Sequence, residues 1–552
     1  MSIKIIERGF SRRGILRAST TALATLAVGG LAGCKPSSGS GGGAKTSSEL
    51  ALQTYKEFTG VKPDLAGSAA GLQPGFLSMP KAFVTGSKGK PLSAPVTGLT
   101  ETFDVPSPAM KSNPYWQRLN AKLGGDLDLI IAQDVGAGYP EKFATILASN
   151  DLPDLMWIPP NQGIPNVGPM LEATFTDLTS HLSGDAVLEY PNLAALKPAS
   201  WKTAVVNGKI WGAPIPSTPM GQCMVANPAV WEKVGGFQST SADEFLDKAK
   251  QISKNNVYAL EPSYINMVHM FGEWFKVPNR WRVNADRTLT YYLETDAYKA
   301  AMEFAAKVFA AGCFHPNPNL PDARPLVATG QIGAYVDVGP STGALRRYKP
   351  DVQAEVLIPF GADGTSEPSY DLGYGTVGFT AFKQADEGRI KQLLALIDWL
   401  SAPFGTTEWV DKNYGTEGAD WMRDTKTGDL LQTKSAQTNA PGLVSALVIM
   451  SNCESVIYNS GHPEDTRSQY EAEQKLLKFA MAIPTSGTYS DTDAKVGAKI
   501  STEARDKMVD IVTGRAKIDS WDAAVKRWRD SGGDKMREEY QAVLPADVPV
   551  TR

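Results

Sequence analysis

The sequence predicts an α/β protein with more than one lobe. Strand-like apolar segments alternate with segments of helical periodicity along most of the chain, a pattern typical of α/β folds with largely parallel sheets. At 552 residues the chain is too long for one hydrophobic core. Hydrophobic residues make up 42% and charged residues 21%, as in ordinary soluble domains.

Short apolar runs predict the strands. Two of them, 99–103 and 127–132, flank a helix that we expect to begin at Asn113 and Pro114. Asparagine is a favoured helix cap and proline is favoured at the first helical position. The other predicted strands are 153–159, 209–214, 223–227, 331–339 and 378–382.

Apolar residues at helical spacing predict the helices. The stripes are Phe245 with Ala249 and Ile252, Tyr298 to Phe309, Ile390 to Leu400, and Trp521 with Val525 and Trp528. The first follows a capping box from Ser241 to Glu244. Gly312 ends the second stripe and Pro403 ends the third. We assign these stripes to the core, and the C-terminal third is mostly helical.

The N-terminus has the pattern of an export signal. Arg12 and Arg13 precede an apolar run, 18–32, that is too short to span a membrane. The segment 11–16 resembles a twin-arginine (Tat) signal, although Ile15 stands where that family prefers phenylalanine. The alternative is an ordinary secretory signal with an accidental arginine pair.

The four residues that end at Cys34, Leu-Ala-Gly-Cys, resemble a bacterial lipobox. This resemblance implies that Cys34 receives a diacylglycerol and becomes the mature N-terminus after the signal peptide, 1–33, is removed. The Ser- and Gly-rich segment 34–48 is then a flexible tether. The alternative is a chance cysteine. Residues 49–95 are rich in Gly, Pro and Ser, and we expect an extended surface arm there, with disorder as the alternative.

Charge and motifs exclude several classes of function. The chain has a formal net charge of −4, and the segment before Cys34 carries five basic residues and one acidic residue, which leaves −8 for the rest. Such an acidic body argues against nucleic acid as a partner.

No cofactor motif is present, because the Gly373–Gly378 G-x-G-x-x-G run precedes a strand-like segment rather than a helix. The four histidines are far apart, so we expect no metal site. Beyond Cys34, three cysteines remain, which allows one disulfide without implying it.

Aromatic residues beside turn-forming residues mark the predicted strand ends. They are Trp157, Trp211, Trp274, Tyr335 and Tyr374. Ligands of α/β proteins bind at the carboxyl ends of parallel strands, and aromatic faces stack on the apolar faces of sugar rings. We therefore predict a carbohydrate site, although a single tryptophan is more often a packing residue.

Four blocks in order, 139–158, 207–236, 275–317 and 511–544, resemble bacterial ABC-transporter solute-binding proteins, in particular large carbohydrate-binding lipoproteins. The resemblance runs from about residue 96 to residue 545. It implies a two-lobed periplasmic-binding-protein type II fold with a hinge and a helical C-terminal region. The first lobe would comprise 96–218 and 372–425, and the second 219–371 and 426–552.

The resemblance also implies a function. A sugar would bind between the lobes without any bond being broken, and the closed, monomeric form would dock on an ABC permease. In that family the loop after "LPDL" and the end of a glycine-containing strand commonly line the cleft. These positions correspond to Trp157 with Ile158, and to Tyr335 with Asp337. Asp337 replaces a residue that is often small in relatives, so it either selects the sugar or is a satisfied turn residue.

Two rival functions stay open at this stage. One is a lipid-anchored glycoside hydrolase and the other is a surface adhesion or sensing protein. The identity and charge of the sugar are also open, since the acidic body disfavours polyanions while Arg280 and Arg282 could pair with a carboxylate.

Overall fold

The computed structural model describes residues 52–133, 138–149, 151–160, 164 and 166–551. The chain divides into two compact units, 1–44 and 45–552, and the description below concerns the second. Arg12, Arg13 and Cys34 lie outside the described residues, so export and lipidation stay predictions. In the described part of the chain, no helix is both long enough and apolar enough to cross a bilayer.

The first sheet has five strands in the order β2-β1-β3-β14-β6. Their bounds are β1 (Val96–Thr102), β2 (Leu127–Gln133), β3 (Leu155–Ile158), β6 (Gly212–Pro216) and β14 (Thr376–Phe382). Strand β1 is parallel to β2 and to β3, with Val96 opposite Leu127. Strand β14 is antiparallel to both β3 and β6.

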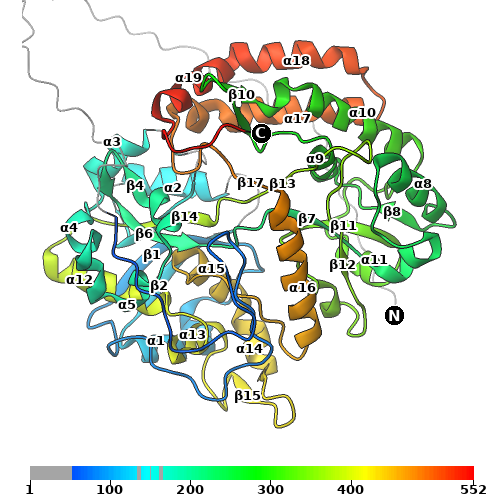
Figure 1. Ribbon diagram of the computed structural model, residues 1–552. Helices are drawn as coiled ribbons and strands as arrows, with labels where there is room; N and C mark the ends of the chain where they lie inside the picture. The colour runs from blue at the N-terminus through cyan, green and yellow to red at the C-terminus, as the bar shows by residue number, and fades with distance from the viewer. Residues whose placement is uncertain (1–51, 134–137, 150, 161–163, 165, 552) are drawn as a thin grey trace, which may run out of the picture. The chain divides into compact units, whose positions relative to one another are not determined.

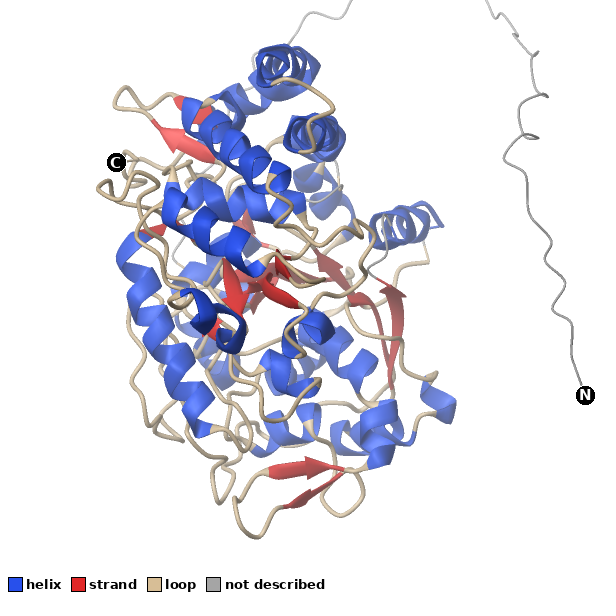
Figure 2. Cartoon of the chain, turned by 90° about the vertical axis from the view of Figure 1, so that its right-hand side faces the viewer, coloured by secondary structure: helices blue, strands red, loops and turns tan. Residues whose placement is uncertain are grey.

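Helices cover both faces of this sheet (Figures 1 and 2). One face packs into a core with α1 (Pro114–Leu123), α12 (Glu387–Leu400) and α15 (Pro441–Met450), and the other with α2 (Gly138–Ser149) and α3 (Val167–Thr174). Neighbouring residues of one strand, Leu155 and Met156, belong to the two different cores because strand side chains alternate in direction. Helix α15, which the predicted division assigns to the second lobe, lies along β1.

The second sheet has four strands in the order β12-β7-β11-β8. Their bounds are β7 (Gln222–Ala226), β8 (Tyr258–Leu260), β11 (Ile332–Val338) and β12 (Glu355–Val356). One face carries α8 (Ala242–Ile252), α9 (Tyr264–Trp274) and α10 (Asp296–Ala310), and the other α11 (Arg324–Ala328) and α16 (Pro463–Leu476). Only β11 and β8 are parallel. The expectation of largely parallel sheets was therefore wrong, because the strands beside the crossings between sheets, β14 and β7, run antiparallel to their neighbours.

The C-terminal region is helical, as predicted. Helices α17 (Ala498–Val512), α18 (Trp521–Trp528) and α19 (Asp534–Val543) pack near α10 and the hairpin of β9 (Trp281–Val283) and β10 (Leu289–Tyr291). The Trp528 ring stacks on Tyr291 with centroids 4.5 Å apart. The predicted apolar face of α18 is confirmed by Trp521 and Trp528, which are at most 1% exposed.

The chain crosses between the two sheets at neighbouring points. One crossing is 217–221, between β6 and β7, and another is 372–375, between β13 (Tyr370–Asp371) and β14. Strand β13 pairs with β17 (Ala480–Met481), and in Figure 1 this pair lies between the two sheets. A Cβ atom on Gly221 would lie 1.8 Å from the carbonyl oxygen of Asp371, so the crossings pack too closely for any side chain there.

Residues 52–95 run in mostly extended conformation over the rest of the chain. Glu408 accepts hydrogen bonds from the backbone of Gly86 and Ser87, and the Phe76 amide donates to the Ile457 carbonyl oxygen. Gln53 is 5% exposed and Gln73 is 6% exposed. Gln73 connects the crossing to α16, because its side chain accepts from the Thr218 hydroxyl and its amide donates to Glu473. Buried side chains along this segment therefore anchor it.

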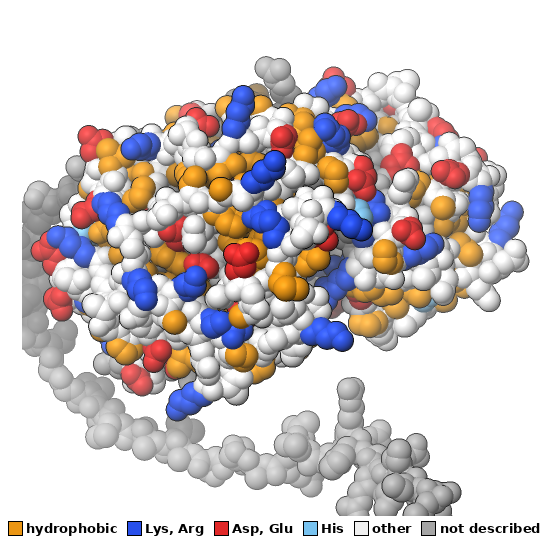
Figure 3. All heavy atoms as spheres, turned by 90° about the horizontal axis from the view of Figure 1, so that it is seen from below, with side chains coloured by type: hydrophobic (Ala, Val, Ile, Leu, Met, Phe, Trp, Pro, Cys, Tyr) orange, Lys and Arg blue, Asp and Glu red, His pale blue; other side chains and the backbone are white. Residues whose placement is uncertain are grey.

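The remaining elements are short and lie in the connections. They are α4 (Thr179–Leu182), α5 (Pro191–Ala194), α6 (Pro198–Trp201), α7 (Pro228–Trp231), α13 (Thr407–Asn413), α14 (Lys434–Asn439), β4 (Val205–Val206), β5 (Lys209–Ile210), β15 (Trp421–Arg423) and β16 (Leu430–Gln432). Figure 3 shows basic and acidic side chains interspersed on the face that it presents. Cys223, Cys313 and Cys453 are free and buried.

The predicted cap of α1 is confirmed. The Asn113 side chain accepts a hydrogen bond from the Trp116 amide at 3.1 Å and donates to the Asn439 carbonyl oxygen at 2.9 Å. Replacing Asn113 with alanine should therefore lower the free energy of unfolding by about 1–2 kcal/mol. Chemical denaturation of both proteins measures this difference, and an unchanged midpoint would contradict the capping role.

Candidate functional site

The three tryptophans predicted at the site are buried in the cores. Trp157, Trp211 and Trp274 are 2–3% exposed. The indole nitrogen of Trp157 donates to the Val377 carbonyl oxygen at 2.7 Å, and that of Trp211 donates to the Val206 carbonyl oxygen at 3.0 Å. A ligand would reach these rings only after a rearrangement. Their contact with a ligand stays a prediction, and their surroundings favour a packing role.

Tyr335 and Asp337 bond to each other at the end of β11. The Tyr335 hydroxyl donates to Asp337 Oδ2 at 2.9 Å, while Asp337 Oδ1 accepts from the Val338 amide at 2.9 Å. Both carboxylate oxygens therefore have partners within the chain. This geometry matches the alternative in which Asp337 is a satisfied turn residue, and selection of the sugar by Asp337 is untested.

Tyr374 is the predicted site residue that lies beside a second candidate. It is half-buried on the crossing 372–375. The guanidinium carbon of Arg280 lies 5.1 Å from the centroid of its ring, within the range of a cation–π interaction. Arg280 precedes β9, 94 positions from Tyr374 in sequence, so only the fold brings the two together.

The backbone holds Arg280 in an uncommon conformation. Its φ angle is 63°, in the left-handed region that non-glycine residues seldom occupy. The neighbouring Asn279 side chain donates to the carbonyl oxygens of Leu372 at 2.9 Å and Met481 at 2.8 Å. The Arg280 carbonyl oxygen accepts from the Tyr292 amide at 2.9 Å. These bonds anchor Arg280 at the crossing between the sheets and stabilise its strained backbone.

Arg280 is open to solvent yet surrounded by protein. Its side chain is exposed. The surrounding protein disfavours the charged form, but the nearby Tyr374, Tyr291 and Tyr292 favour it, and the net effect raises the pKa of Arg280. The side chain is therefore accessible to water and yet has many protein atoms around it, and we call the region around Arg280, Tyr374, His269 and Asp371 the recess. His269 is in the same situation: its side chain is 42% exposed, but desolvation, followed by the charge of Arg280, lowers its pKa to about 4. The imidazole is therefore neutral at neutral pH.

Carboxyl groups also border this recess. His269 Nε2 lies 3.6 Å from Asp371 Oδ2, and a Glu273 oxygen accepts from the Asp371 amide at 2.9 Å. Burial raises the pKa of both Glu273 and Asp371, which favours the protonated form of this closely spaced pair. Asp493 accepts from the Tyr540 hydroxyl at 2.5 Å, and burial also raises its pKa. None of these three carboxyl groups forms an ion pair or hydrogen bond with the Arg280 guanidinium, although Asp493 attracts its charge through space.

A hydrogen bond also joins two segments that are distant in sequence. The Tyr489 hydroxyl donates to the Ile164 carbonyl oxygen at 2.6 Å, which connects the segment after β17 to the connection after β3. No sequence pattern pointed to Tyr489, His269, Asp371 or Asp493. Only Arg280, in the "PNRWR" run, carried a visible signal.

His462, Glu464 and Asp465 offer three potential metal-ligand atoms within 4.8 Å of one another. Arg346 bonds both acids, with Nε 2.5 Å from Asp465 and Nη2 3.1 Å from Glu464. The guanidinium therefore already balances the negative charge of this cluster, and the arrangement gives no reason to assign a metal there.

Two curated proteins of Bacillus subtilis are similar to this chain, whereas no family model matches it. Lipoprotein LipO is 19% identical over 84% of this chain and 97% of its own length. The polygalacturonan/rhamnogalacturonan-binding protein YtcQ is 21% identical over 75% of this chain and 85% of its own length.

Solved structures share the fold. An extracellular solute-binding protein from Bifidobacterium longum subsp. infantis has a TM-score of 0.61 and 15% identity, and the match covers 82% of this chain and 97% of that one. The S. pneumoniae ABC-transporter substrate-binding protein FusA, solved with kestose, has a TM-score of 0.58 and 16% identity, over 81% and 98% of the two chains. The protein therefore has the two-lobed α/β fold of the extracellular solute-binding proteins of ABC transporters.

Proposed function

We propose that this protein is the extracellular substrate-binding component of an ABC importer and that it captures an oligosaccharide between its two lobes. The observation that carries the proposal is the recess at the crossing between the sheets, where Arg280 lies over Tyr374. Hinge closure around a ligand at such a crossing is a common mechanism of two-lobed proteins. The similarity to binding proteins, rather than to enzymes, supports capture without chemistry.

The remaining parts of the proposal concern location and assembly. A lipid on Cys34 would hold the protein at the outer face of the cytoplasmic membrane, with 34–48 as the tether. The lobes would be those predicted, except that α15 belongs with the first sheet, and the hinge segments would be 217–221 and 372–375. The protein would act as a monomer that delivers its sugar to a membrane permease. A Cys34→Ser change should then release the protein from the membrane fraction into the medium.

A thermal-shift screen of the chain from residue 35 onward tests capture. We expect one class among neutral and acidic oligosaccharides to raise the melting temperature, since a ligand at a hundredfold excess over its Kd stabilises the folded state by about 2.7 kcal/mol. Mass spectrometry of the same samples should show the sugar intact after long incubation. Cleavage products would favour the glycoside hydrolase, and no response to any sugar would favour an adhesion or sensing role.

A further inference from the structure

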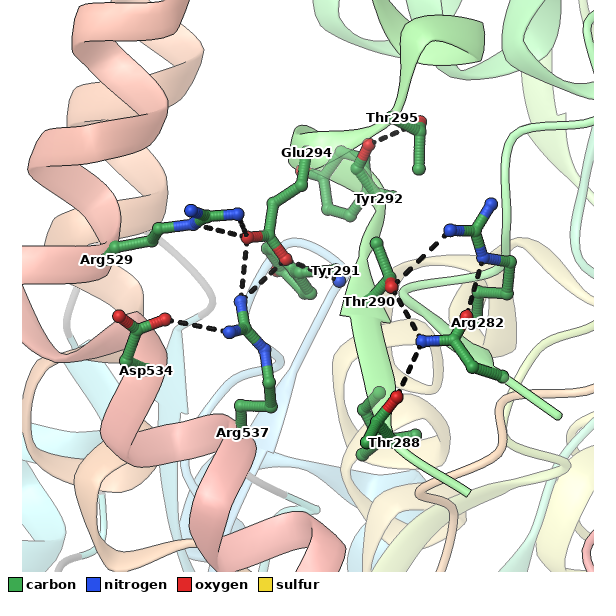
Figure 4. Close-up of polar contacts among 12 residues, drawn as sticks. Arg282, Thr288, Thr290, Tyr291, Tyr292, Glu294, Thr295, Arg529, Asp534 and Arg537 are labelled. Carbon is green, nitrogen blue, oxygen red and sulfur yellow. Dashed lines mark hydrogen bonds and ion pairs between the residues drawn. The ribbon is translucent and has the colours of Figure 1, made fainter. Parts of the chain in front are cut away.

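The guanidinium of Arg280 lacks a partner that other arginines of this region have. Arg282, two positions along, donates to Asn284 at 3.0 Å and to Thr290 at 3.5 Å (Figure 4). Arg529 and Arg537 both pair with Glu294. Among the residues that the structure describes, none forms an ion pair or a side-chain hydrogen bond with the Arg280 guanidinium. Its five N–H donors therefore have no hydrogen-bond acceptor among the described residues, although the Tyr374 ring lies 5.1 Å away and the charge of Asp493 acts on it through space.

A partly desolvated guanidinium without a hydrogen-bonded counter-charge raises the free energy of the protein until a ligand supplies one. Taking a charge out of water costs free energy, and a carboxylate held by two parallel hydrogen bonds compensates for it best. The recess offers no such hydrogen-bonded partner from within: burial disfavours the charged form of Asp371, and Asp493 attracts Arg280 through space but bonds to Tyr540. The φ angle of 63° at Arg280 adds strain that the Asn279 hydrogen bonds maintain. The fold thus preserves an exposed cation at the crossing between the sheets.

A second observation places an unmatched polar atom beside the same recess. Asp371 is 6% exposed, and its Oδ1 has no hydrogen-bond partner. Its other oxygen lies 3.6 Å from Nε2 of the half-exposed His269. A protonated carboxyl and a neutral imidazole both suit hydroxyl groups, which they can donate to or accept from. The recess therefore combines one site for an anion with neighbouring sites for hydroxyl groups.

We infer that the ligand is an acidic oligosaccharide and that Arg280 binds the carboxylate of one uronate residue while Tyr374 lies beneath the guanidinium. This inference rests on the proposed capture of an oligosaccharide and names its chemical class. A uronate presents a carboxylate and hydroxyl groups on one ring, which matches the unpaired cation and the polar atoms around it. A neutral sugar would leave the guanidinium without a hydrogen-bonded counter-charge.

Calorimetric titration of the chain from residue 35 onward with matched sugars tests this inference. The probes are a trigalacturonate, its methyl ester, which lacks the charge, and a neutral galactotriose. We expect the acid to bind at least tenfold more tightly than the ester. Arg280→Gln should weaken binding of the acid about 30-fold, because a hydrogen-bonded ion pair is lost, and should change the affinity for the neutral sugars by less than threefold. Arg280→Lys should restore part of the loss, and raising the salt concentration should weaken binding of the acid alone.

Arg282→Gln is the matched control, since Arg282 has partners on its own hairpin. It should leave all affinities within threefold of the original, and both variants should keep the melting temperature because neither removes an ion pair. Equal binding of acid and ester, or an equal loss of both in Arg280→Gln, would overturn the acidic class while sparing sugar capture. Failure to bind any carbohydrate would instead overturn the proposed function.

Discussion

Glu294→Gln is expected to lower the free energy of unfolding by about 3 kcal/mol. The Glu294 side chain is 4% exposed, with one oxygen 2.7 Å from Arg537 and the other in an ion pair with Arg529, and its Oε2 accepts from the Tyr291 amide at 2.9 Å (Figure 4). Removing one partner from a buried ion pair costs about 3–5 kcal/mol, although Arg537 keeps a second ion pair with Asp534. The estimate is at the lower end because Arg529 is 47% exposed.

Urea denaturation followed by circular dichroism measures this loss. Glu303→Gln is the control, because Glu303 is exposed on α10 and a surface change there should alter stability by less than about 0.5 kcal/mol. The three groups come from the segment after β10, from α19 and from the turn after α18, so the change should loosen the C-terminal helices first. Equal midpoints for Glu294→Gln and the original would mean that water screens these pairs as it screens surface ion pairs.

Stability is expected to fall as the pH rises from 5 to 8. Burial raises the pKa of Glu473 to about 7 and that of Asp371 to about 8. Both values lie above those of the unfolded chain, so the folded state binds these protons more tightly. The stabilisation is complete below pH 4 and is lost as the pH passes through 7 and 8. For Glu473 the loss is roughly 3 kcal/mol, from 1.36 kcal/mol per pKa unit.

Glu473→Gln isolates the contribution of one carboxyl group. Glu473 is fully buried on α16, and its Oε2 accepts from the Gln73 amide at 3.2 Å, a bond that a glutamine carbonyl oxygen can also accept. The variant should show a weaker dependence of unfolding free energy on pH between 5 and 8, whereas Glu471→Gln, an exposed change on the same helix, should keep the original dependence. Identical pH profiles for all three proteins would show that Glu473 does not hold its proton.

Local sequence signals predicted the elements well because each depends on residues a few positions apart. Asn113 caps α1 as expected, and Ser241 caps α8. The Glu244 side chain of the expected capping box accepts a hydrogen bond from the Thr240 amide rather than from the Ser241 amide. The run Gly373–Gly378 leads into strand β14, which confirms that the dinucleotide motif lacks its helix.

The site was harder to predict because it depends on long-range packing. Trp157 and Trp211 lie in or beside strands as predicted, whereas Trp274 ends helix α9, so its predicted strand end was wrong. In addition, position in a strand does not show how tightly a neighbouring helix covers a side chain. Tyr374 gained its significance from Arg280, which reaches it only through the anchoring of Asn279 on the crossing strands.

By itself, the sequence determined the α/β class, most strands and helices, and the resemblance to solute-binding proteins, because side-chain periodicity and caps act over short distances. The tertiary structure decided the mixed strand directions, the burial of the three tryptophans and the position of α15 on the first sheet. It also decided that the Arg280 guanidinium lies over the Tyr374 ring without an ion pair or a side-chain hydrogen bond to the described residues. Burial and pairing are sums over contacts between distant segments, and only the packed fold specifies those contacts.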